Sequence, residues 1–342
     1  MSQDQPPYRV AIAGCHRMLQ RELAYHNFAS AFNAVAETEV VAVFDYGEET
    51  RTDFLSCWRD VWGEIPTYSD YDLMLREIQP DLLCVATRQT QHADQIEAAV
   101  EVGVRGILCD KPLATTLSEM DRILEACTDT PLVFGLDRRW NARYKHLREN
   151  LADLLGTVTG LVAYGLPNTI NHGCHWYDTI LALMGDPEPV WVSGLIDDSE
   201  SDSPRRKMDP PARAQIGMNN AAVAYVSPDG KGPSFEVTGE EGRLSIFANA
   251  TDAYLRREDG DRALALSLPS VDEDWPTGPA MVRDLVQAVE NGTRSDCDLP
   301  EARRATEIGF AIHSSSAQNG AKISLPATDR SLRVESFPWG NE

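Results

Sequence analysis

Short apolar runs alternate with amphipathic stretches over the first 135 residues. The runs predict strands, and the stretches predict helices because their apolar residues recur at three- and four-residue spacing. The strands are expected at 8–13, 39–44, 81–86, 106–109 and 132–134, and the helices at about 18–36, 52–62, 71–78, 92–102 and 117–127. Strands that are apolar on both faces and separated by helices are typical of a parallel sheet with helices on both sides.

The pattern changes after about residue 138, where several strands follow one another with turn signals between them. Strands are expected at 158–164, 190–195, 221–226, 234–238, 244–248 and 253–257, an exposed loop at 197–211, and helices at about 144–154, 174–184, 280–290 and 301–318. This pattern predicts an α+β domain with a largely antiparallel sheet. The fold class is therefore α/β: an N-terminal Rossmann doubly wound parallel sheet at 7–137 and an α+β domain at 138–342.

The composition narrows the classes of molecule that the protein is expected to bind. The 342 residues carry a formal charge of −22, and such a surface repels nucleic acid and anionic lipid. The N-terminus lacks the basic and apolar regions of a signal peptide, and no apolar run approaches the length of a spanning helix. The seven cysteines are odd in number and contain no C-x-x-C pair, so neither a disulfide framework nor a zinc ribbon is expected. We expect a cytoplasmic protein that binds neither nucleic acid nor membrane.

A strand ending in Gly14 and a second strand ending in Asp45 form the frame of a dinucleotide-binding unit. In such units backbone amides at a helix start hold the pyrophosphate, and the acid binds the adenosine ribose. His16 and Leu19 stand where the second and third glycines would fall, and Arg17 lies between them. The pattern fits a dinucleotide site and equally any doubly wound domain with a tight first turn. In a dinucleotide site, Asp45 favours NAD over NADP because a carboxylate repels a 2′-phosphate.

Polar residues follow the strand at 81–86. Thr87 and Gln89 stand at its carboxyl end, where α/β sheets bind ligands, and can contact cofactor ribose or pyrophosphate. The alternative is a capped helix start near Thr90, with His92 a packing residue.

Lys111 is one of only five lysines, and it follows the strand at 106–109 within Asp110-Lys111-Pro112. A lysine at a strand's carboxyl end can reach a substrate hydroxyl beside a nicotinamide ring. Burial near a positive ring lowers a lysine pKa toward the range that proton transfer needs. The alternative is an ordinary solvated lysine.

The second candidate cluster lies at 171–178, where a helix is expected to begin near Cys174. His175 and Asp178 are three residues apart, so they share one helix face, where an imidazole and a carboxylate suit proton exchange and hydroxyl binding. Metal binding through His172, Cys174 and His175 is the weaker interpretation, because adjacent ligands on one turn diverge. We therefore expect no metal site. A capped helix with a core histidine remains the structural alternative.

In order and spacing these motifs resemble the Gfo/Idh/MocA family of NAD(P)-dependent sugar and cyclitol oxidoreductases. The resemblance rests on Gly14, Asp45, Ala86-Thr87…His92, the segment 103–114 with its Asp110-Lys111-Pro112, the segment 138–144, Gly173-Cys174-His175-Trp176-Tyr177-Asp178, the segment 307–313 and the segment 323–326. It covers nearly the whole chain.

The resemblance implies Lys111 and His175 as acid/base residues, Asp178 as a substrate ligand, and a sheet that mediates homo-oligomers, here a dimer or tetramer. Asn171 stands where many members have a catalytic Asp, and Asp110 replaces the usual Glu. We expect Asn171, Arg139 and Trp140 to line the substrate site. Gly14, His16, Arg17, Asp45, Thr87, Gln89, His92, Asp110 and Lys111 are expected to contact the cofactor.

The leading hypothesis is an NAD-linked oxidoreductase, with NADP the lesser candidate, acting on a secondary hydroxyl or carbonyl of a sugar, cyclitol or derivative. Two alternatives stay open. One is glycoside cleavage with transient redox chemistry on bound NAD. The other is a non-catalytic regulatory protein that binds NAD or sugar, which Asn171 and the glycine-poor loop favour.

Overall fold

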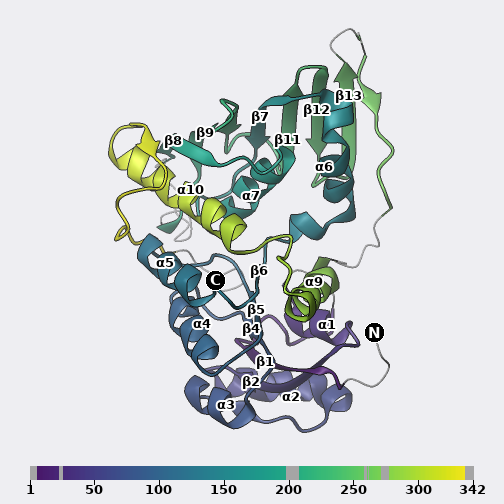
Figure 1. Ribbon diagram of the computed structural model, residues 1–342, viewed down its shortest axis with the longest axis vertical. Helices are drawn as coiled ribbons and strands as arrows, with labels where there is room; N and C mark the ends of the chain where they lie inside the picture. Colours follow the sequence, from purple (N-terminus) through teal and green to yellow (C-terminus); the bar gives the residue numbers. More distant parts are fainter. Residues whose placement is uncertain are drawn as a thin grey trace. The chain divides into compact units, whose positions relative to one another are not determined.

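A computed structural model describes residues 6–22, 26–197, 208–257, 260, 262–270 and 277–335 (Figure 1). The chain divides into two compact units, and each unit is formed from several stretches of sequence. The first unit comprises Met1–Ala114, Glu119–Asp137 and Asp272–Ala302, and the second comprises Thr115–Ser118, Arg138–Val271 and Arg303–Glu342. The sequence analysis expected two domains, at 7–137 and 138–342. It did not predict that the chain returns to the first unit at Asp272–Ala302.

The first unit contains a six-stranded parallel sheet in the order β3-β2-β1-β4-β5-β6. Its strands are β1 (Tyr8–Ala13), β2 (Thr38–Phe44), β3 (Thr67–Tyr68), β4 (Leu82–Val85), β5 (Gly106–Cys109) and β6 (Leu132–Phe134). The Rossmann sheet predicted from the sequence is confirmed. β3 was not predicted, because two residues are too few to show a hydrophobic pattern.

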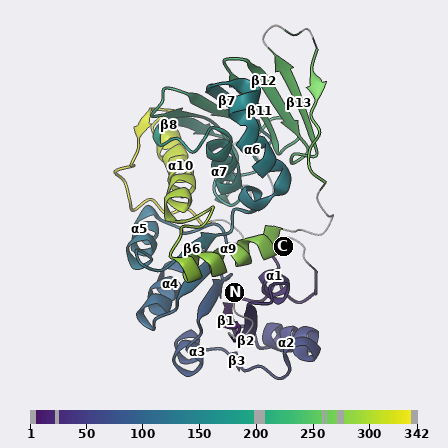
Figure 2. The same cartoon turned by 45° about the vertical axis from the view of Figure 1, so that its right-hand side comes forward.

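Helices cover both faces of this sheet, as predicted. They are α1 (Phe28–Asn33), α2 (Glu48–Trp62), α3 (Tyr71–Ile78), α4 (His92–Glu101), α5 (Leu117–Ala126) and α9 (Thr277–Asn291). Figures 1 and 2 show α1, α2 and α9 along one face, and α3 and α4 along the other. The sequence pattern placed the helix at 280–290 in the second domain, but α9 packs against α1, β5 and β6. Gly106 permits this packing, since a Cβ there would lie only 2.6 Å from a methyl carbon of Val289.

The first helix differs from the prediction. A helix was expected at about 18–36, but α1 begins only at Phe28, with Asn27 accepting a hydrogen bond from the Ser30 amide. The preceding loop is held by side-chain bonds in place of helical ones. Trp58 donates to the Met18 carbonyl at 2.8 Å, and Arg21 donates to the Cys57 carbonyl through Nε at 2.7 Å. The loop's contacts with α2 thus override its helical spacing.

The second unit contains a nine-stranded sheet in the order β14-β13-β12-β11-β7-β10-β9-β8-β15. Its strands are β7 (Val158–Tyr164), β8 (Pro189–Ile196), β9 (Ala212–Met218), β10 (Val223–Val226), β11 (Ser234–Gly239), β12 (Gly242–Phe247), β13 (Asp252–Arg257), β14 (Leu264–Ala265) and β15 (Ile323–Ser324). Only β7 and β10 pair in parallel, so the predicted, largely antiparallel sheet is confirmed. β9 was missed because its alternating small apolar and polar residues give a weak signal. Residues 198–207 of the expected loop lie outside the described residues.

Three helices lie on one face of the second unit's sheet: α6 (Ala142–Leu155), α7 (Gly173–Leu183) and α10 (Leu299–Ala317), whose first four residues belong to the first unit (Figure 1). The short 3₁₀ helix η1 (Asp137–Trp140) precedes α6. Strand residues on the other face, which we call the open face, include several exposed large side chains. They are Tyr164, Leu195, Tyr225, Phe247 and Tyr254.

The cysteines are all free thiols, and all except Cys57 are buried. Burial raises the pKa of the Cys127 thiol to about 12, with the Asp298 carboxylate adding to the effect. Within the described residues, none of the helices combines the length and apolar character that crossing a bilayer requires.

Candidate active site

The turn after β1 passes very close to the turn after β4. Gly14 has a φ of +86°, and a Cβ there would lie 2.6 Å from the Ala86 carbonyl oxygen and 2.7 Å from the Thr87 amide nitrogen. Both the left-handed conformation and the close approach therefore require glycine. This first glycine position has the property that a dinucleotide turn needs, although the second and third glycines are absent.

Asp45 lies directly after β2, beside this turn. Its carboxylate accepts hydrogen bonds from the Cys15 amide at 3.0 Å and from the Gly47 amide at 3.0 Å. These two bonds fix the carboxylate at the carboxyl end of the sheet. The Cys15 thiol also donates to Oδ2, whereas Oδ1 still has a lone pair for a further donor such as a ribose hydroxyl.

Asp110 connects the β1 loop to the end of β5. Its buried carboxylate lies 2.8 Å from His26 Nδ1 and 3.1 Å from Arg17 Nη1, and it accepts from the Lys111 amide at 2.8 Å. Burial alone would raise the pKa of Asp110, but His26, Arg17 and Lys111 outweigh it and hold that pKa far below its usual range. The side chain is therefore ionised near neutral pH, and it fixes the backbone of Lys111.

His92 and Thr87 connect the β4 turn to the segment after β5. The buried His92 ring lies 3.1 Å from the Leu113 carbonyl through Nδ1 and 3.2 Å from the Thr87 carbonyl through Nε2. Burial lowers the pKa of His92 despite the nearby Asp110 carboxylate. Thr87 donates to Gln95 Oε1 at 2.6 Å, and Gln89 is buried nearby in the chain. His92 thus holds the Thr87 backbone in place.

Lys111 is almost fully buried between Asp110 and Pro112, and its peptide bond to Pro112 is cis. His16 is exposed, and Arg17 is turned toward Asp110. Three contacts bring most of the residues predicted to bind the cofactor together at the carboxyl edge of the first sheet: Gly14 with Thr87, Asp45 with Cys15, and Arg17 with Asp110.

The His175 helix begins on a backbone turn that a buried carboxylate holds. Asp209 accepts from the amides of Thr169, Ile170 and Asn171 at 2.8–3.0 Å. α7 starts two residues later, with His175 and Asp178 both buried on it. The sequence analysis missed Asp209 because it placed this residue in an exposed loop at 197–211. The signal that could have singled out Asp209 is its place directly before Pro210-Pro211.

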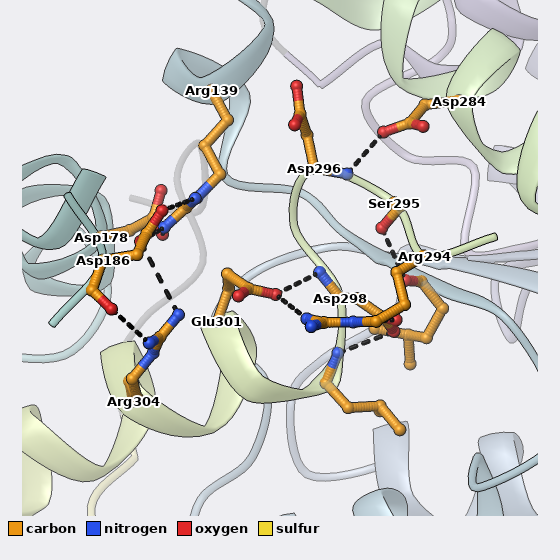
Figure 3. A network of polar contacts seen from close by, with 12 residues as sticks. Arg139, Asp178, Asp186, Asp284, Arg294, Ser295, Asp296, Asp298, Glu301 and Arg304 are labelled. Atoms are coloured by element: carbon orange, nitrogen blue, oxygen red, sulfur yellow. Dashed lines mark hydrogen bonds and ion pairs between the residues drawn. The ribbon is translucent and has the colours of Figure 1, made fainter. Parts of the chain in front are cut away.

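Arg139 and Asp178, both predicted to bind substrate, contact each other (Figure 3). Arg139 donates to Asp178 Oδ1 at 2.7 Å through Nε, and it makes a two-pronged ion pair with Asp186 at 2.7 and 3.1 Å. Burial would raise the pKa of Asp186, but the bonds and charges of Arg139, Arg304 and Arg148 lower it. Asp186 and Arg304 were not predicted, because sequence spacing does not show which helices meet. Trp140 lies half-buried at the end of η1.

Lys111 and His175, the predicted acid/base pair, belong to the first and second unit respectively. Among residues 6–22, 26–197 and the other described ranges, no group of three His, Cys, Asp or Glu side chains is arranged to bind a metal ion.

Comparison with known proteins identifies the first unit. Residues 8–137 match the model of the Gfo/Idh/MocA oxidoreductase family, which has an NAD-binding Rossmann fold. Over these residues the chain matches the NAD-binding domain of the Gfo/Idh/MocA family. The family resemblance predicted from the sequence motifs is confirmed over residues 8–137.

The similarity to individual proteins is limited to part of the chain. The chain is 30% identical over 109 residues to an inositol 2-dehydrogenase of Paracoccus denitrificans, covering 31% of this chain and 32% of the relative. It is 29% identical over 152 residues to a D-xylose 1-dehydrogenase (NADP⁺) of Haloferax volcanii, covering 38% and 46%. The matches thus span less than half the length of these two relatives.

The fold likeness extends further. An oxidoreductase from Agrobacterium radiobacter, solved in complex with NAD⁺, L-tartaric acid and magnesium, has a TM-score of 0.77. The two proteins are 16% identical, and the match covers 94% of this chain and 99% of the neighbour. At this identity the likeness shows the fold alone.

Proposed function

We propose that this Gfo/Idh/MocA protein is an NAD-dependent oxidoreductase of a secondary hydroxyl or carbonyl on a sugar, a cyclitol or a derivative of either. The main support is Lys111, a buried lysine at the carboxyl end of β5, whose backbone Asp110 fixes from the cofactor side of the sheet. The dehydrogenase names of the relatives support the substrate class.

The residues of the first sheet fit the adenosine half of a dinucleotide. The close approach of Gly14 to Thr87 leaves no room for a side chain, and the Asp45 carboxylate is fixed where an adenosine ribose would be bound. A fixed carboxylate there favours NAD, because it repels the 2′-phosphate of NADP. Arg17, whose Nη1 pairs with Asp110, is the cation of the β1 loop that we propose lies near the pyrophosphate.

When bound, the cofactor supplies a hydride acceptor at nicotinamide C4. In the oxidation direction, Lys111 takes the proton from the substrate hydroxyl while the hydride leaves the same carbon. The reverse reduction returns that proton from Lys111 to the carbonyl oxygen. His175 assists the proton transfer, since imidazole exchanges protons near neutral pH.

The second unit supplies the substrate side of the proposal. Asn171 donates and accepts hydrogen bonds but takes up no proton, so the proton transfer rests on Lys111 and His175. Asp178 already accepts from Arg139, which orients its carboxylate toward a substrate hydroxyl through the remaining lone pairs. Trp140 offers an apolar ring face for a sugar.

The test is turnover of purified protein with NAD and a panel of inositols, aldoses and glycosides, measured as NADH absorbance together with product analysis. Lys111→Ala is expected to lower kcat by about 10³-fold, a usual loss for a general base, while NAD affinity stays within about threefold. Lys111→Arg should be equally inactive, because a guanidinium keeps its proton. The matched control is Lys231→Ala, at an exposed turn, which should retain turnover.

Each result has a distinct meaning. NADH accumulation supports the dehydrogenase, product without NADH supports glycoside cleavage, and NAD binding with neither supports a regulatory protein. Full activity in Lys111→Ala would refute the proposed role of that lysine. Tighter binding of NADP than of NAD would refute the role of Asp45.

A further inference from the structure

Two buried polar side chains of α4 contact the same residue, Thr87, just beyond the carboxyl end of β4. His92 and Gln95 are three residues apart, so they lie on the same face of the helix. The His92 ring lies 3.2 Å from the Thr87 carbonyl oxygen through Nε2, and Gln95 Oε1 accepts from the Thr87 hydroxyl at 2.6 Å. One helix face therefore holds both the backbone and the side chain of Thr87.

Gln95 is itself fixed by a neighbouring helix. Tyr71, buried at the start of α3, donates from its hydroxyl to the Gln95 carbonyl oxygen at 2.7 Å. Only 4% of Gln95 is exposed, and its buried Nε2 has no hydrogen-bond partner among the residues that the structure describes. A buried amide nitrogen without a partner lowers stability, so folding alone does not account for an amide at this position. What the amide does provide is an oxygen that accepts from Thr87.

The direction of this bond decides what the Thr87 hydroxyl can offer a ligand. A threonine hydroxyl has one proton to donate and two lone pairs that accept. Its proton is committed to Gln95 Oε1, and the Thr87 residue is only half-buried. The hydroxyl therefore presents lone pairs alone to a ligand. A group that carries its own proton can bond to it, whereas a phosphate oxygen, which only accepts, cannot.

The place of Thr87 in the sheet narrows the ligand group further. β1 lies between β2 and β4, so Gly14 after β1 has Asp45 on one side and Thr87 on the other. A Cβ on Gly14 would lie 2.7 Å from the Thr87 amide nitrogen, which shows how close the two turns are. If the β1 turn holds the pyrophosphate, the nearest proton-carrying groups of a dinucleotide are the hydroxyls of its riboses.

We propose that Gln95 is a positioning residue of the cofactor site: by taking the Thr87 proton, it makes Thr87 an acceptor for a ribose hydroxyl of the dinucleotide. This inference rests on the proposed function, because it takes a dinucleotide as the ligand of this sheet edge. The sequence left ribose and pyrophosphate open as partners of Thr87, and the bond to Gln95 selects ribose. Every residue used belongs to the first unit.

The experiment measures dissociation constants of the full chain, by calorimetry without sugar, for NAD and for NAD analogues that each lack one ribose hydroxyl. An analogue that loses one neutral hydrogen bond should bind the wild type about fivefold more weakly than NAD does. For one analogue, Thr87→Val should abolish this difference and Gln95→Met should reduce it. The double variant Thr87→Val/Gln95→Met should bind NAD no more weakly than Thr87→Val alone, because Gln95 acts through Thr87.

Two controls separate positioning from stability. Ile96→Val alters a buried neighbour on α4 and should lower the unfolding temperature while the difference between NAD and the analogue stays as in the wild type. Gln287→Met makes the same exchange as Gln95→Met at an exposed position of α9 and should leave NAD binding unchanged. A Gln95→Met variant that behaves like Ile96→Val, or a further loss in the double variant, would overturn the proposal.

Thr87→Val tests the acceptor role even where Gln95→Met fails to fold. If Thr87 instead donated to the pyrophosphate, Thr87→Val would weaken NAD and every analogue by the same factor, which would also overturn the proposal. A wild type that binds no NAD would refute the proposed function and this inference together. NAD binding with unchanged ribose differences in the variants would refute this inference alone. Retained turnover in Lys111→Ala would refute only the role of that lysine.

Discussion

Asp110 shows how one side chain can serve both stability and the candidate site. Its carboxylate bonds to His26, Arg17 and the Lys111 amide while buried. The Asp110→Asn variant removes the ion pair with Arg17, and breaking a buried pair in this way costs about 3 kcal/mol. Urea unfolding at pH 7 should show this loss, with exposed Asp53→Asn as a control that changes stability little.

The loss should depend on pH with a defined sign. The folded pKa of Asp110 is depressed, so its contribution is complete above the unfolded pKa of about 3.9 and falls as the pH drops below that value. The stability difference between wild type and Asp110→Asn should therefore be constant from pH 7 to 5 and shrink below about pH 4. A difference that grows on acidification would contradict the assignment.

Arg139 is the second residue whose removal has a defined cost. The Arg139→Met variant leaves Asp178 buried without its cation, which costs about 3–5 kcal/mol of unfolding free energy. The double variant Arg139→Met/Asp178→Asn should recover part of this loss, since the uncompensated charge is gone. Chemical denaturation checks both, and exposed Arg283→Met should change stability by less than about 0.5 kcal/mol. Equal losses in the single and double variants would refute the ion pair.

At the residue scale, the sequence predicted where side chains stand along the elements better than it predicted which side chains contact each other. The positions of Gly14, Asp45 and Lys111 just after strands were predictable, because apolar runs locate strand ends well. The pairing of Arg139 with Asp178 was not predictable, since their separation in sequence says nothing of how η1 meets α7. His26 was missed for the same reason, whereas Asp209 was missed because it was expected in an exposed loop.

At the scale of elements, the left-handed residues in the turn between β12 and β13 should lower the free energy of unfolding by a measurable amount. A left-handed alanine costs about 1–2 kcal/mol, and glycine at that position relieves the cost at a smaller entropic penalty. Ala248→Gly, at an exposed position, should therefore raise the unfolding free energy by about 0.5–1 kcal/mol.

The same substitution within a helix provides the control. Ala98→Gly in α4 should lower stability by about 1 kcal/mol, because glycine is a poor helix former. Thermal unfolding of both variants distinguishes the two signs. Destabilisation by Ala248→Gly would show that the turn is not strained.

Elements with strong periodicity were predicted close to their observed bounds, as for α3 at Tyr71–Ile78 and β7 at Val158–Tyr164. The failures have physical causes. The expected helix at 18–36 was mostly replaced by a loop bonded to Trp58 and its neighbours on α2. α9 was assigned to the wrong sheet, because an amphipathic pattern shows that a helix is buried on one side but not which surface it contacts.

At the scale of the whole molecule, the exposed aromatic residues of the open face lead us to predict that copies of the chain associate through it. Tyr225 is 46% exposed and Tyr254 38% exposed, and aromatic side chains that are exposed together mark an interaction surface. We expect a homo-oligomer that buries this face. Light scattering after size exclusion should show a dimer or tetramer, and Tyr225→Glu/Tyr254→Glu should raise its dissociation constant at least tenfold. Val61→Glu on α2 is the control, and a monomeric wild type would contradict the prediction.

The buried thiols have a practical consequence for following the unfolding of each unit. Cys57 is accessible, so an alkylating reagent should modify it first, whereas the other thiols react only when the surrounding structure opens. Cys174 belongs to the second unit, and the remaining buried cysteines belong to the first. Mass spectrometry of peptides alkylated over time would therefore give a separate opening rate for each unit in the unmodified chain, without an introduced label.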